Sequence, residues 1–349
     1  MTQTLRTDVL IIGAGLAGSL LAWRLIQAGK SVHILHNPKL TSASRVAAGL
    51  INPVTGQRLV LQENIEVLLP AAHALYQQLE EQFHTQFFFE KDMLRSLQHD
   101  KAKLAWKKRQ LDSAYQHYIC EIPSSPDVIK QSQTGYLDTN ALLDALHGYF
   151  QQYNCLTEGD AQQHDIQVHQ SAQYHLQWKH ITASTVVFCQ GWREINNKFF
   201  SFLPFQPAKG EILHLSTPNK LPEHIINQGK WLLPLNDGNF KIGATYQSNT
   251  NDEQTTEEGK KELLTALKSM PIEQQNITLT NHQAGIRPNT LDKQPFLGMH
   301  PKHKNIAIFN GFGSKGSLLI PWYSKSMCGH LIHGTALPGH ADIKRFACV

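Results

Sequence analysis

Three glycines near the start of the chain have a spacing that suits phosphate binding. Gly13, Gly15 and Gly18 stand in the run GAGLAG, directly after the apolar residues 9–12. The first glycine permits a tight turn, the second lets a pyrophosphate approach the backbone, and the third lets a helix pack closely on a strand. A helix that begins here also offers free N–H groups and the positive end of its dipole to an anion. This spacing predicts the binding of a dinucleotide.

The elements that must position these glycines are also predicted. Residues 9–12 are typical of a buried parallel strand, and apolar residues at helical spacing follow the last glycine. Gly29 ends this helix, and residues 32–35 form a second apolar strand. The position after that strand is usually acidic and accepts the ribose hydroxyls. It holds His36, followed by Asn37, and both side chains have an atom that accepts a hydrogen bond.

A second glycine-rich turn lies near the other end of the sequence. Residues 305–310 read as a strand that enters GFGSKG at 311–316, and a helical stretch then reaches residue 332. One nucleotide seldom needs two such turns, whereas a flavin dinucleotide is long and needs backbone contacts away from its pyrophosphate. Just upstream, Arg287 carries a guanidinium, which pairs with a carboxylate in a bidentate fork. A helix cap or an ion pair between two lobes remains the alternative role for this arginine.

Composition places the chain among globular proteins. It has 349 residues, of which 41% are hydrophobic and 17% charged, enough for two lobes. Five cysteines are scattered without a CxxC pair, which fits a reducing compartment. No stretch looks long and apolar enough to span a bilayer, so we expect a cytoplasmic protein. The histidine pairs at 300/303 and 330/333 lack a carboxylate or cysteine nearby, and no metal site is expected.

One stretch is more basic than the mild net charge of +4 would suggest. Residues 91–109 hold seven lysines and arginines against two aspartates. The simplest interpretation is a solvated helix face. Contact with RNA or with an anionic membrane surface is the alternative.

The rest of the chain predicts an α/β fold with an α+β substrate lobe. A strand-rich stretch covers about 164–190, residues 209–250 alternate as antiparallel strands do, and a helix follows at 257–269. We expect a Rossmann-like nucleotide-binding domain of residues 1–80, 140–205 and 285–349. It is interleaved with a substrate-binding domain, built on an antiparallel sheet, of residues 81–139 and 206–284.

Together these motifs resemble the D-amino acid oxidase superfamily, the flavoproteins that include glycine oxidase, sarcosine oxidase and D-amino acid dehydrogenase. The resemblance covers nearly the full length. It rests on GAGLAG (13–18), SASRVAAG (42–49), GYLDT (135–139), VVFCQGW (186–192), WLLP (231–234), KIGAT (241–245), GIRPNTLDKQPFLG (285–298) and GFGSKG (311–316).

The resemblance implies FAD as the cofactor. Sarcosine oxidases tether their flavin to a cysteine where this chain has Gly285, so the FAD is expected to be non-covalent. The binding residues that it implies are Gly13, Ala14, Gly15, Leu16, Ala17 and Gly18 for the pyrophosphate; His36 and Asn37 at the ribose; Ser42, Ser44, Arg45, Ala48 and Gly49 beside the ribityl chain and flavin; Gly191 and Trp192 near the adenosine; and Gly311, Phe312, Gly313, Ser314, Lys315 and Gly316 at the pyrimidine edge.

The resemblance also implies roles on the substrate side. Arg287 would bind the substrate carboxylate, and Trp231 stands where relatives often place a tyrosine. Lys241 matches a lysine that helps oxygen accept electrons in sarcosine oxidases. The expected reaction is oxidation of the C–N bond of an amino acid or secondary amine that carries a carboxylate. Hydride passes to the flavin, and O2 or a respiratory electron acceptor then takes the electrons.

Other functions remain open at this stage. GFGSKG also resembles the oxidase domain of a bifunctional tRNA wobble-uridine enzyme that removes a carboxymethyl group from tRNA, although its methyltransferase half has no counterpart here. Residues 91–109 would then contact RNA. A flavin-dependent 2-hydroxy acid dehydrogenase would need a base for the hydroxyl proton, and no histidine stands out for it. A flavoprotein that acts only as an interaction scaffold is disfavoured by Arg287.

Overall fold

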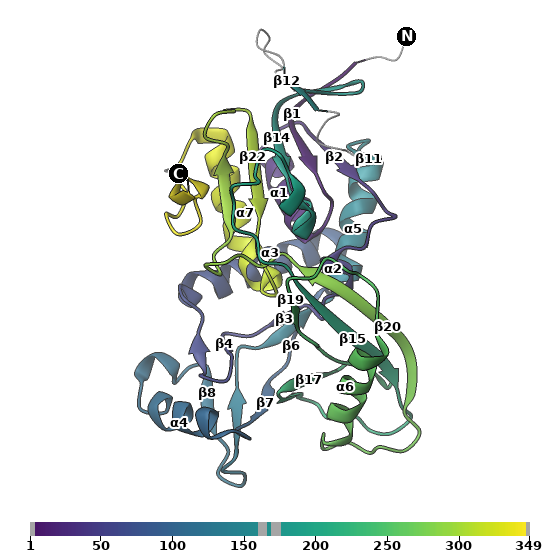
Figure 1. The fold of residues 1–349 in the computed structure, drawn as a ribbon, viewed down its shortest axis with the longest axis vertical. Helices are drawn as coiled ribbons and strands as arrows, with labels where there is room; N and C mark the ends of the chain where they lie inside the picture. The colour runs from purple at the N-terminus through teal and green to yellow at the C-terminus, as the bar shows by residue number, and fades with distance from the viewer. Residues whose placement is uncertain (1–3, 160–165, 169–175, 347–349) are drawn as a thin grey trace. The chain divides into compact units, whose positions relative to one another are not determined.

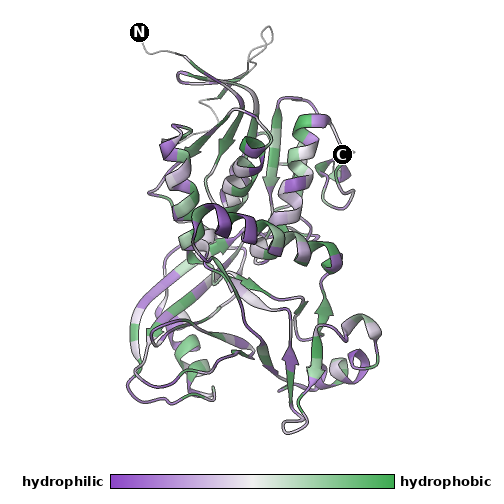
Figure 2. Cartoon of the chain, turned by 180° about the vertical axis from the view of Figure 1, so that it is seen from behind, coloured by the Kyte–Doolittle hydropathy of each residue, from purple (hydrophilic) through white to green (hydrophobic). Residues whose placement is uncertain are grey.

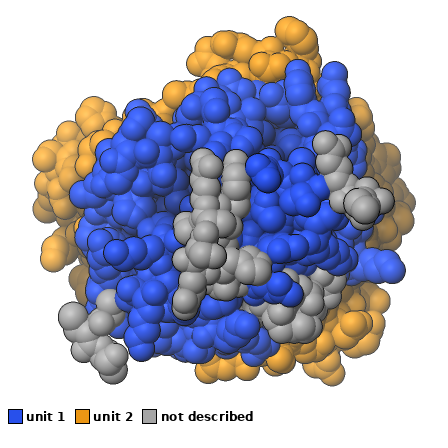
Figure 3. Space-filling model, turned by 90° about the horizontal axis from the view of Figure 1, so that it is seen from above, with its two compact units in different colours: residues 1–45, 139–208, 286–349 blue, residues 46–138, 209–285 orange. Residues whose placement is uncertain are grey.

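The computed structural model describes residues 4–159, 166–168 and 176–346. Part of the stretch predicted to be strand-rich, and Cys348, lie outside these residues. The chain divides into two compact units, coloured separately in Figure 3. Unit 1 comprises residues 1–45, 139–208 and 286–349, and unit 2 comprises residues 46–138 and 209–285.

Unit 1 is built on an eight-stranded sheet (Figure 1). Its strands are β1 (Leu5–Ile12), β2 (Val32–His36), β11 (Leu156–Glu158), β12 (Ile166–Val168), β13 (Leu176–Trp178), β14 (Ile181–Phe188), β21 (Phe296–Met299) and β22 (Ile306–Asn310). Five of them form a parallel centre in the order β11–β2–β1–β14–β22. Strand β21 pairs antiparallel with β22, and the β12–β13 hairpin extends from β14.

Helices cover the parallel centre. They are α1 (Leu16–Gln27), α5 (Thr139–Gln152) and α7 (Gly316–His333). The chain also forms the short α2 (Ala43–Val46), which begins in unit 1, and the 3₁₀ turns η3 (Gly191–Asn196) and η4 (Ile343–Phe346) of unit 1. Helix α1 packs against both α5 and α7. Because a parallel sheet is buried on both faces, its strands carry continuous apolar runs, and Ile11, Ile34 and Val187 are fully buried. Figure 2 shows these strands as hydrophobic. Among the described helices, none has the length and hydropathy needed to cross a bilayer.

Unit 2 contains a nine-stranded, mostly antiparallel sheet. Its strands are β7 (Met93–Ser96), β8 (Ile119–Glu121), β9 (Val128–Gln131), β15 (Ala208–Ser216), β16 (Ile225–Gln228), β17 (Lys230–Pro234), β18 (Asn239–Gly243), β19 (Gln247–Ser248) and β20 (Thr278–Arg287). The order is β19–β15–β18–β17–β16–β7–β9–β8, with β20 beside β15. Strands β16 and β7 run parallel.

The two faces of this sheet differ in chemistry. Helix α6 (Glu257–Lys268) packs on one face, where Leu213, Phe240 and Ile242 join Leu263 in an apolar cluster. Side chains alternate between the faces of a strand, and directly paired residues of antiparallel strands share a face. The opposite face therefore carries the neighbours of Phe240 and Ile242 along β18, including Lys241.

Smaller elements complete unit 2. They are the three-stranded sheet β3–β10–β6 (Leu50–Ile51, Gly135–Leu137, Phe88–Glu90), the pair β4 (Val54–Thr55) and β5 (Val60–Leu61), the helices α3 (Ile65–Phe83) and α4 (Asp100–Arg109), and the 3₁₀ turn η1 (Ser113–Tyr115). Residues 46–80, expected in the nucleotide-binding domain, thus lie in unit 2. The reason is strand pairing, since β3 pairs with β10, which pairs with β6.

The basic stretch is not one continuous helix face, and that interpretation was wrong for its first half. Only residues 100–109 are helical, because the segment before them forms strand β7. The side chain of Arg95 lies on the buried face of that strand and is 8% exposed. Its guanidinium donates to the Gly56 carbonyl oxygen at 2.8 Å. This arginine is therefore a buried structural residue of unit 2.

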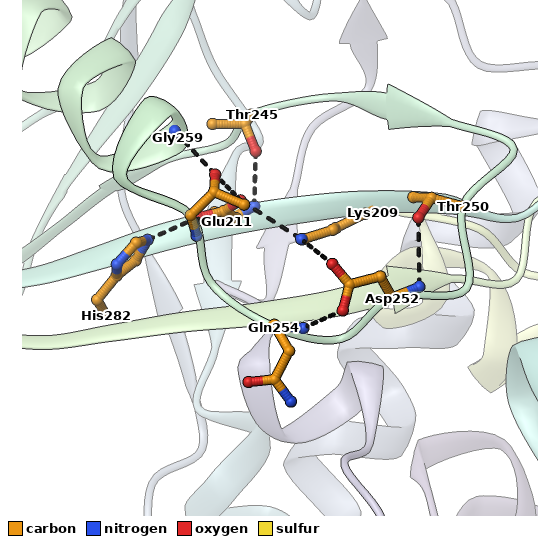
Figure 4. Close-up of polar contacts among 9 residues, drawn as sticks. Lys209, Glu211, Thr245, Thr250, Asp252, Gln254, Gly259 and His282 are labelled. Atoms are coloured by element: carbon orange, nitrogen blue, oxygen red, sulfur yellow. Dashed lines mark hydrogen bonds and ion pairs between the residues drawn. The ribbon is translucent and has the colours of Figure 1, made fainter.

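A buried polar cluster joins three elements of unit 2 on the α6 side of the sheet (Figure 4). Glu211 accepts hydrogen bonds from the Thr256 N–H and hydroxyl at 2.9 and 2.8 Å. His282 Nε2 lies 2.8 Å from the same carboxylate, and Lys209 Nζ lies 3.2 Å from Asp252. Thr256 in turn caps α6 by accepting from the Gly259 N–H. The cluster ties the start of α6 to strands β15 and β20, and it has a structural role.

Candidate active site

The first glycine turn has a geometry that only glycine permits. Gly13 has a φ of 106°, in the region that L side chains rarely adopt. A Cβ there would lie 2.6 Å from the Cys189 carbonyl oxygen, and one at Gly18 would lie 1.9 Å from the Gly13 carbonyl oxygen. The turn therefore holds α1 against β1 and β14, as the spacing of the glycines predicted.

The helix end beyond this turn faces two hydroxyl groups. Gly15 is the N-cap of α1 and supplies no side-chain hydrogen bond. A Cβ at Gly15 would meet Ser44 Oγ at 3.3 Å and Ser42 Oγ at 3.4 Å. The Leu16 N–H donates to Ser44 Oγ at 3.0 Å. The structure thus brings residues 42–44 to the N-terminus of α1. Ala14 and Ala17 belong to the glycine turn and the first residues of α1 at this same place.

Arg45 is held by helix α5 of the same unit. Its guanidinium lies 2.6 Å from the Asp144 carboxylate and donates to the Asn140 carbonyl oxygen at 3.1 Å. The next two predicted residues, Ala48 and Gly49, belong to unit 2. Gly49 has a φ of 70°, and a Cβ there would lie 1.9 Å from the Leu137 carbonyl oxygen.

A neutral imidazole stands at the end of β2. The His36 ring lies 4.9 Å from that of His147, whose Nε2 is 2.8 Å from the Ala14 carbonyl oxygen. Burial, and secondarily the charge of Arg45, lower the pKa of His36. Asn37 Oδ1 accepts from the Lys39 N–H at 3.0 Å. His36 is therefore a neutral hydrogen-bonding group where an acidic residue is usual.

The end of β14 is tied to the end of β22. Asn310 Nδ2 donates to the Gly191 carbonyl oxygen at 2.9 Å, and Gly191 has a φ of 62°. The Arg193 guanidinium lies 4.9 Å from the centre of the Trp192 ring. In an open parallel sheet, ligands bind beyond the carboxyl ends of the strands. Gly191 and Trp192 lie at such an end.

The second glycine turn is fastened to the Arg287 turn inside unit 1. Gly311 and Gly313 have φ values of 84° and 54°. The Gly313 N–H donates to the Pro288 carbonyl oxygen at 3.2 Å. A Cβ at Gly313 would lie 2.6 Å from Asn289 Oδ1. The half-buried Arg287, the last residue of β20, therefore precedes a turn that contacts the glycine turn directly.

The other residues of the second glycine turn have distinct environments. Phe312 is buried against Phe309, with ring centres 4.9 Å apart, whereas Ser314 is exposed. Lys315 is the N-cap of α7, and Gly316 begins that helix. Burial, and secondarily Lys293, lower the pKa of Lys315.

Trp231 and Lys241 share one face of the large sheet in unit 2. Trp231 pairs with Gly243, and Lys241 pairs with Leu233 on one side and His214 on the other. A Cβ at Gly243 would lie 2.6 Å from Trp231 Cζ2, so the glycine makes room for the indole. Trp231 also packs against an apolar cluster that includes Leu233.

Comparison with known proteins identifies the family. A family model described as DAO, FAD dependent oxidoreductase, matches residues 8–328. The chain belongs to this family. The DAO description makes it an FAD-dependent oxidoreductase, which confirms the cofactor and the reaction class expected from the motifs.

Individual proteins also match this chain in sequence. Glycine oxidase from Pseudomonas putida is 28% identical over 120 residues, which are 34% of this chain and 33% of that protein. The match thus spans about a third of that relative's length. A tRNA 5-methylaminomethyl-2-thiouridine biosynthesis bifunctional protein from Acinetobacter baylyi is 22% identical over 356 residues, 95% of this chain and 54% of that protein.

Solved structures confirm the fold. Glycine oxidase from Geobacillus kaustophilus superposes with a TM-score of 0.81 at 20% identity and covers 98% of both chains. Iminodiacetate oxidase from Chelativorans sp. BNC1 has a TM-score of 0.77 at 20% identity, covering 95% of this chain and 97% of that one. The mixed α/β fold with a Rossmann-like part and an antiparallel-sheet part is therefore as predicted.

The residues of unit 1 fit the cofactor of the DAO family. Side chains at Gly13 or Gly18 would collide with backbone, so glycine at these positions lets the turn and the start of α1 pack closely. The N-cap residue Gly15 has no side chain to cap the helix, and the hydroxyl groups of Ser42 and Ser44 stand beside it, with Ser44 Oγ accepting from the Leu16 N–H at 3.0 Å. Backbone N–H groups, hydroxyls and a helix dipole are suitable partners for a pyrophosphate. Among the described residues, no cluster of three or more His, Cys, Asp or Glu able to hold a metal is found.

Sequence reasoning missed one residue of the Lys241 face. His214 stands opposite Lys241 on β15, and its Nε2 is buried without a hydrogen-bond partner among the described residues. Burial and Lys241 lower the pKa of His214 to about 4, and a hydrogen bond with Gln283 opposes the shift. Burial likewise lowers the pKa of Lys241, and Asp138 opposes it. Only the pairing of β15 with β18 reveals His214, since alternation alone does not say which strands are neighbours.

Proposed function

We propose that this chain oxidises the C–N bond of an amino acid or secondary amine that carries a carboxylate. The substrate carboxylate binds the Arg287 guanidinium, which would hold the carbon next to nitrogen in place to lose its hydride. The nitrogen lone pair forms the C=N bond as the hydride departs, so the amine must be neutral. Water then hydrolyses the imine to a carbonyl compound and an amine.

One observation supports this assignment above the others. The turn that follows Arg287 is hydrogen-bonded to the second glycine turn, through Gly313 and Pro288. Both turns belong to unit 1, which also carries the first glycine turn. A residue that binds substrate must keep a fixed position relative to the bound cofactor, because misplacement of about 1 Å costs rate. The glycine turn provides that fixed reference for Arg287.

The remaining assignments follow the same scheme. Bound FAD supplies the hydride acceptor. Its pyrophosphate, ribose, ribityl and flavin contacts are assigned to the residues named in the sequence analysis, most of them in unit 1. Gly285 stands where sarcosine oxidases have a tethering cysteine, so the FAD is held without a covalent bond. We place the protein in the cytoplasm, with O2 or a respiratory electron acceptor reoxidising the flavin.

Replacing Arg287 tests the proposal. Arg287→Ala should lower kcat/KM for a carboxylate substrate by roughly 100-fold or more, because it removes a charge-assisted bidentate contact. Its bound FAD, measured by absorbance, should stay unchanged. The substrate is chosen first by anaerobic bleaching with D-amino acids, N-methyl amino acids, iminodiacetate and 2-hydroxy acids.

An amide analogue of the substrate provides the internal control. Wild type should discriminate strongly against the amide, whereas Arg287→Ala should accept acid and amide about equally. Arg58→Ala, at an exposed arginine of unit 2, should behave as wild type. Equal loss of both substrates in Arg287→Ala would mean that this arginine does not bind the carboxylate.

A second candidate substrate is a modified tRNA. The match to the tRNA-modifying protein of Acinetobacter baylyi favours it, since 95% of this chain aligns with 54% of that protein. The same Arg287 chemistry would act on a carboxymethylamino group attached to uridine. Filter binding of tRNA at two salt concentrations separates the candidates, because phosphate contacts make affinity fall steeply with salt. Tight, salt-sensitive binding with no turnover of free amines would favour the tRNA substrate.

A further inference from the structure

Helix α4 of unit 2 presents apolar side chains to solvent. Leu111, just beyond its end, is 83% exposed, and Leu104 is 71% exposed. These are the highest exposures among the large hydrophobic residues that the structure describes. Single exposed apolar residues are ordinary on protein surfaces, so these two leucines carry an argument only together with the residues around them.

The two leucines lie on the same face of the helix. Gln110, the C-cap, keeps right-handed helical angles, so the helical path continues toward Leu111. Residues seven positions apart are two turns apart and point the same way. The opposite face is anchored, because Ala102 and Trp106 pack in a cluster with Tyr115. Rotation of α4 to bury the leucines is therefore excluded.

Lysines surround the leucine pair. Lys101, Lys107 and Lys108 are exposed, and within the described ranges none of them forms an ion pair. Lys103 differs, since it lies 2.7 Å from Asp127. We call Lys101, Leu104, Lys107, Lys108 and Leu111 the α4 stripe.

The combination of these side chains identifies the partner. Leucines between lysines match a surface that is anionic outside and apolar just beneath, as a bilayer with acidic headgroups is. RNA offers phosphates but no apolar layer for the leucines, and its recognition relies on aromatic stacking and arginine. We propose that the α4 stripe binds the surface of an anionic lipid bilayer, with the leucines in the interfacial layer and the lysines at the headgroups.

Co-sedimentation with vesicles tests this proposal. The FAD-loaded protein is mixed with vesicles of phosphatidylcholine alone or of phosphatidylcholine with phosphatidylglycerol. We expect binding to the acidic vesicles only, weakened by added salt. The double variants Leu104→Ser/Leu111→Ser and Lys107→Gln/Lys108→Gln should each bind at least about tenfold more weakly. All four positions are exposed, so flavin absorbance and melting temperature should stay unchanged.

Matched controls come from two other helices of unit 2. Lys261→Gln/Lys268→Gln removes the same charge from exposed positions of α6, and Val67→Ser removes an exposed apolar residue of α3. Both controls should bind vesicles as wild type does. The proposal fails if wild type ignores acidic vesicles, or if it binds tRNA through these lysines instead. It also fails if the leucine variant binds as well as wild type, because the contact would then be electrostatic alone.

Discussion

Lys241 lies on a sheet face beside a histidine that burial keeps neutral at physiological pH. An ammonium group there can stabilise negative charge that develops on oxygen as it accepts electrons. Lys241→Met should therefore slow reoxidation of the reduced protein by O2 by about 10-fold to 100-fold, a range set by the loss of one preorganised charge. Reduction by substrate under anaerobic conditions should change little. Stopped-flow absorbance measures the two half-reactions separately.

Lys230 offers a matched control for Lys241 in the same sheet. It lies on β17 next to Trp231 and therefore faces the other way, where its Nζ donates to the Ala244 carbonyl oxygen at 2.9 Å. Lys230→Met should lower stability without a selective effect on oxygen. If both variants slow reoxidation by O2 equally, the effect is due to a general disturbance of the sheet and not to the charge of Lys241.

The glycine turn at residues 13–18 sets the position of helix α1 relative to strand β1. A Cβ at Gly18 would lie 1.9 Å from the Gly13 carbonyl oxygen, with backbone rather than a flexible side chain in the way. Gly18→Ala should push α1 away from the strand, cost roughly 1–3 kcal/mol of stability and reduce the FAD content of the purified protein. Titration with FAD, followed by fluorescence quenching, measures the loss of affinity.

Gly29, which follows the same helix, is the comparison. It has a φ of 78°, but a side chain there would meet nothing within 4 Å. Gly29→Ala should cost about 1 kcal/mol through backbone strain alone and leave FAD affinity unchanged. Loss of FAD in both variants would show that general destabilisation, and not the position of α1, controls binding.

At the scale of the whole molecule, a buried carboxyl makes stability depend on pH. Glu194 is 0% exposed, and burial raises its pKa from 4.5 to about 7 despite hydrogen bonds from Asn197 and Gln190. The folded state thus keeps this proton to higher pH than the unfolded state does. The stabilisation is complete below the unfolded pKa and is lost as pH rises through the folded one.

Glu194→Gln should remove this dependence. Between about pH 4.5 and 7, the free energy of unfolding of wild type should fall by roughly 3 kcal/mol relative to the variant. Urea denaturation at a series of pH values gives the difference in slope, which is insensitive to any constant offset from the substitution. Parallel pH profiles for the two proteins would show that Glu194 does not titrate differently in the folded state.

Local features were the ones that sequence predicted well. The glycines at 13, 15 and 18 are required by a turn of a few residues, and their spacing, together with the apolar runs on either side, indicated strand, turn and helix. The helix predicted at 257–269 is α6, Glu257–Lys268. Arg95 was misjudged as part of a solvated face, because burial of an arginine depends on Gly56, a partner from a distant part of the chain. His214 was missed for a similar reason, since its neighbour Lys241 comes from another strand.

The amino-acid sequence by itself determined the nucleotide-binding turn, the fold class and the family resemblance. These depend on steric limits and side-chain periodicity over short stretches, which the order of residues states directly. Tertiary structure alone decided that the Arg287 turn is bonded to the second glycine turn, that Lys241 stands beside His214, and that Leu104 and Leu111 are exposed. Burial and charge environment arise from residues far apart in the chain, and only the folded backbone brings those residues together.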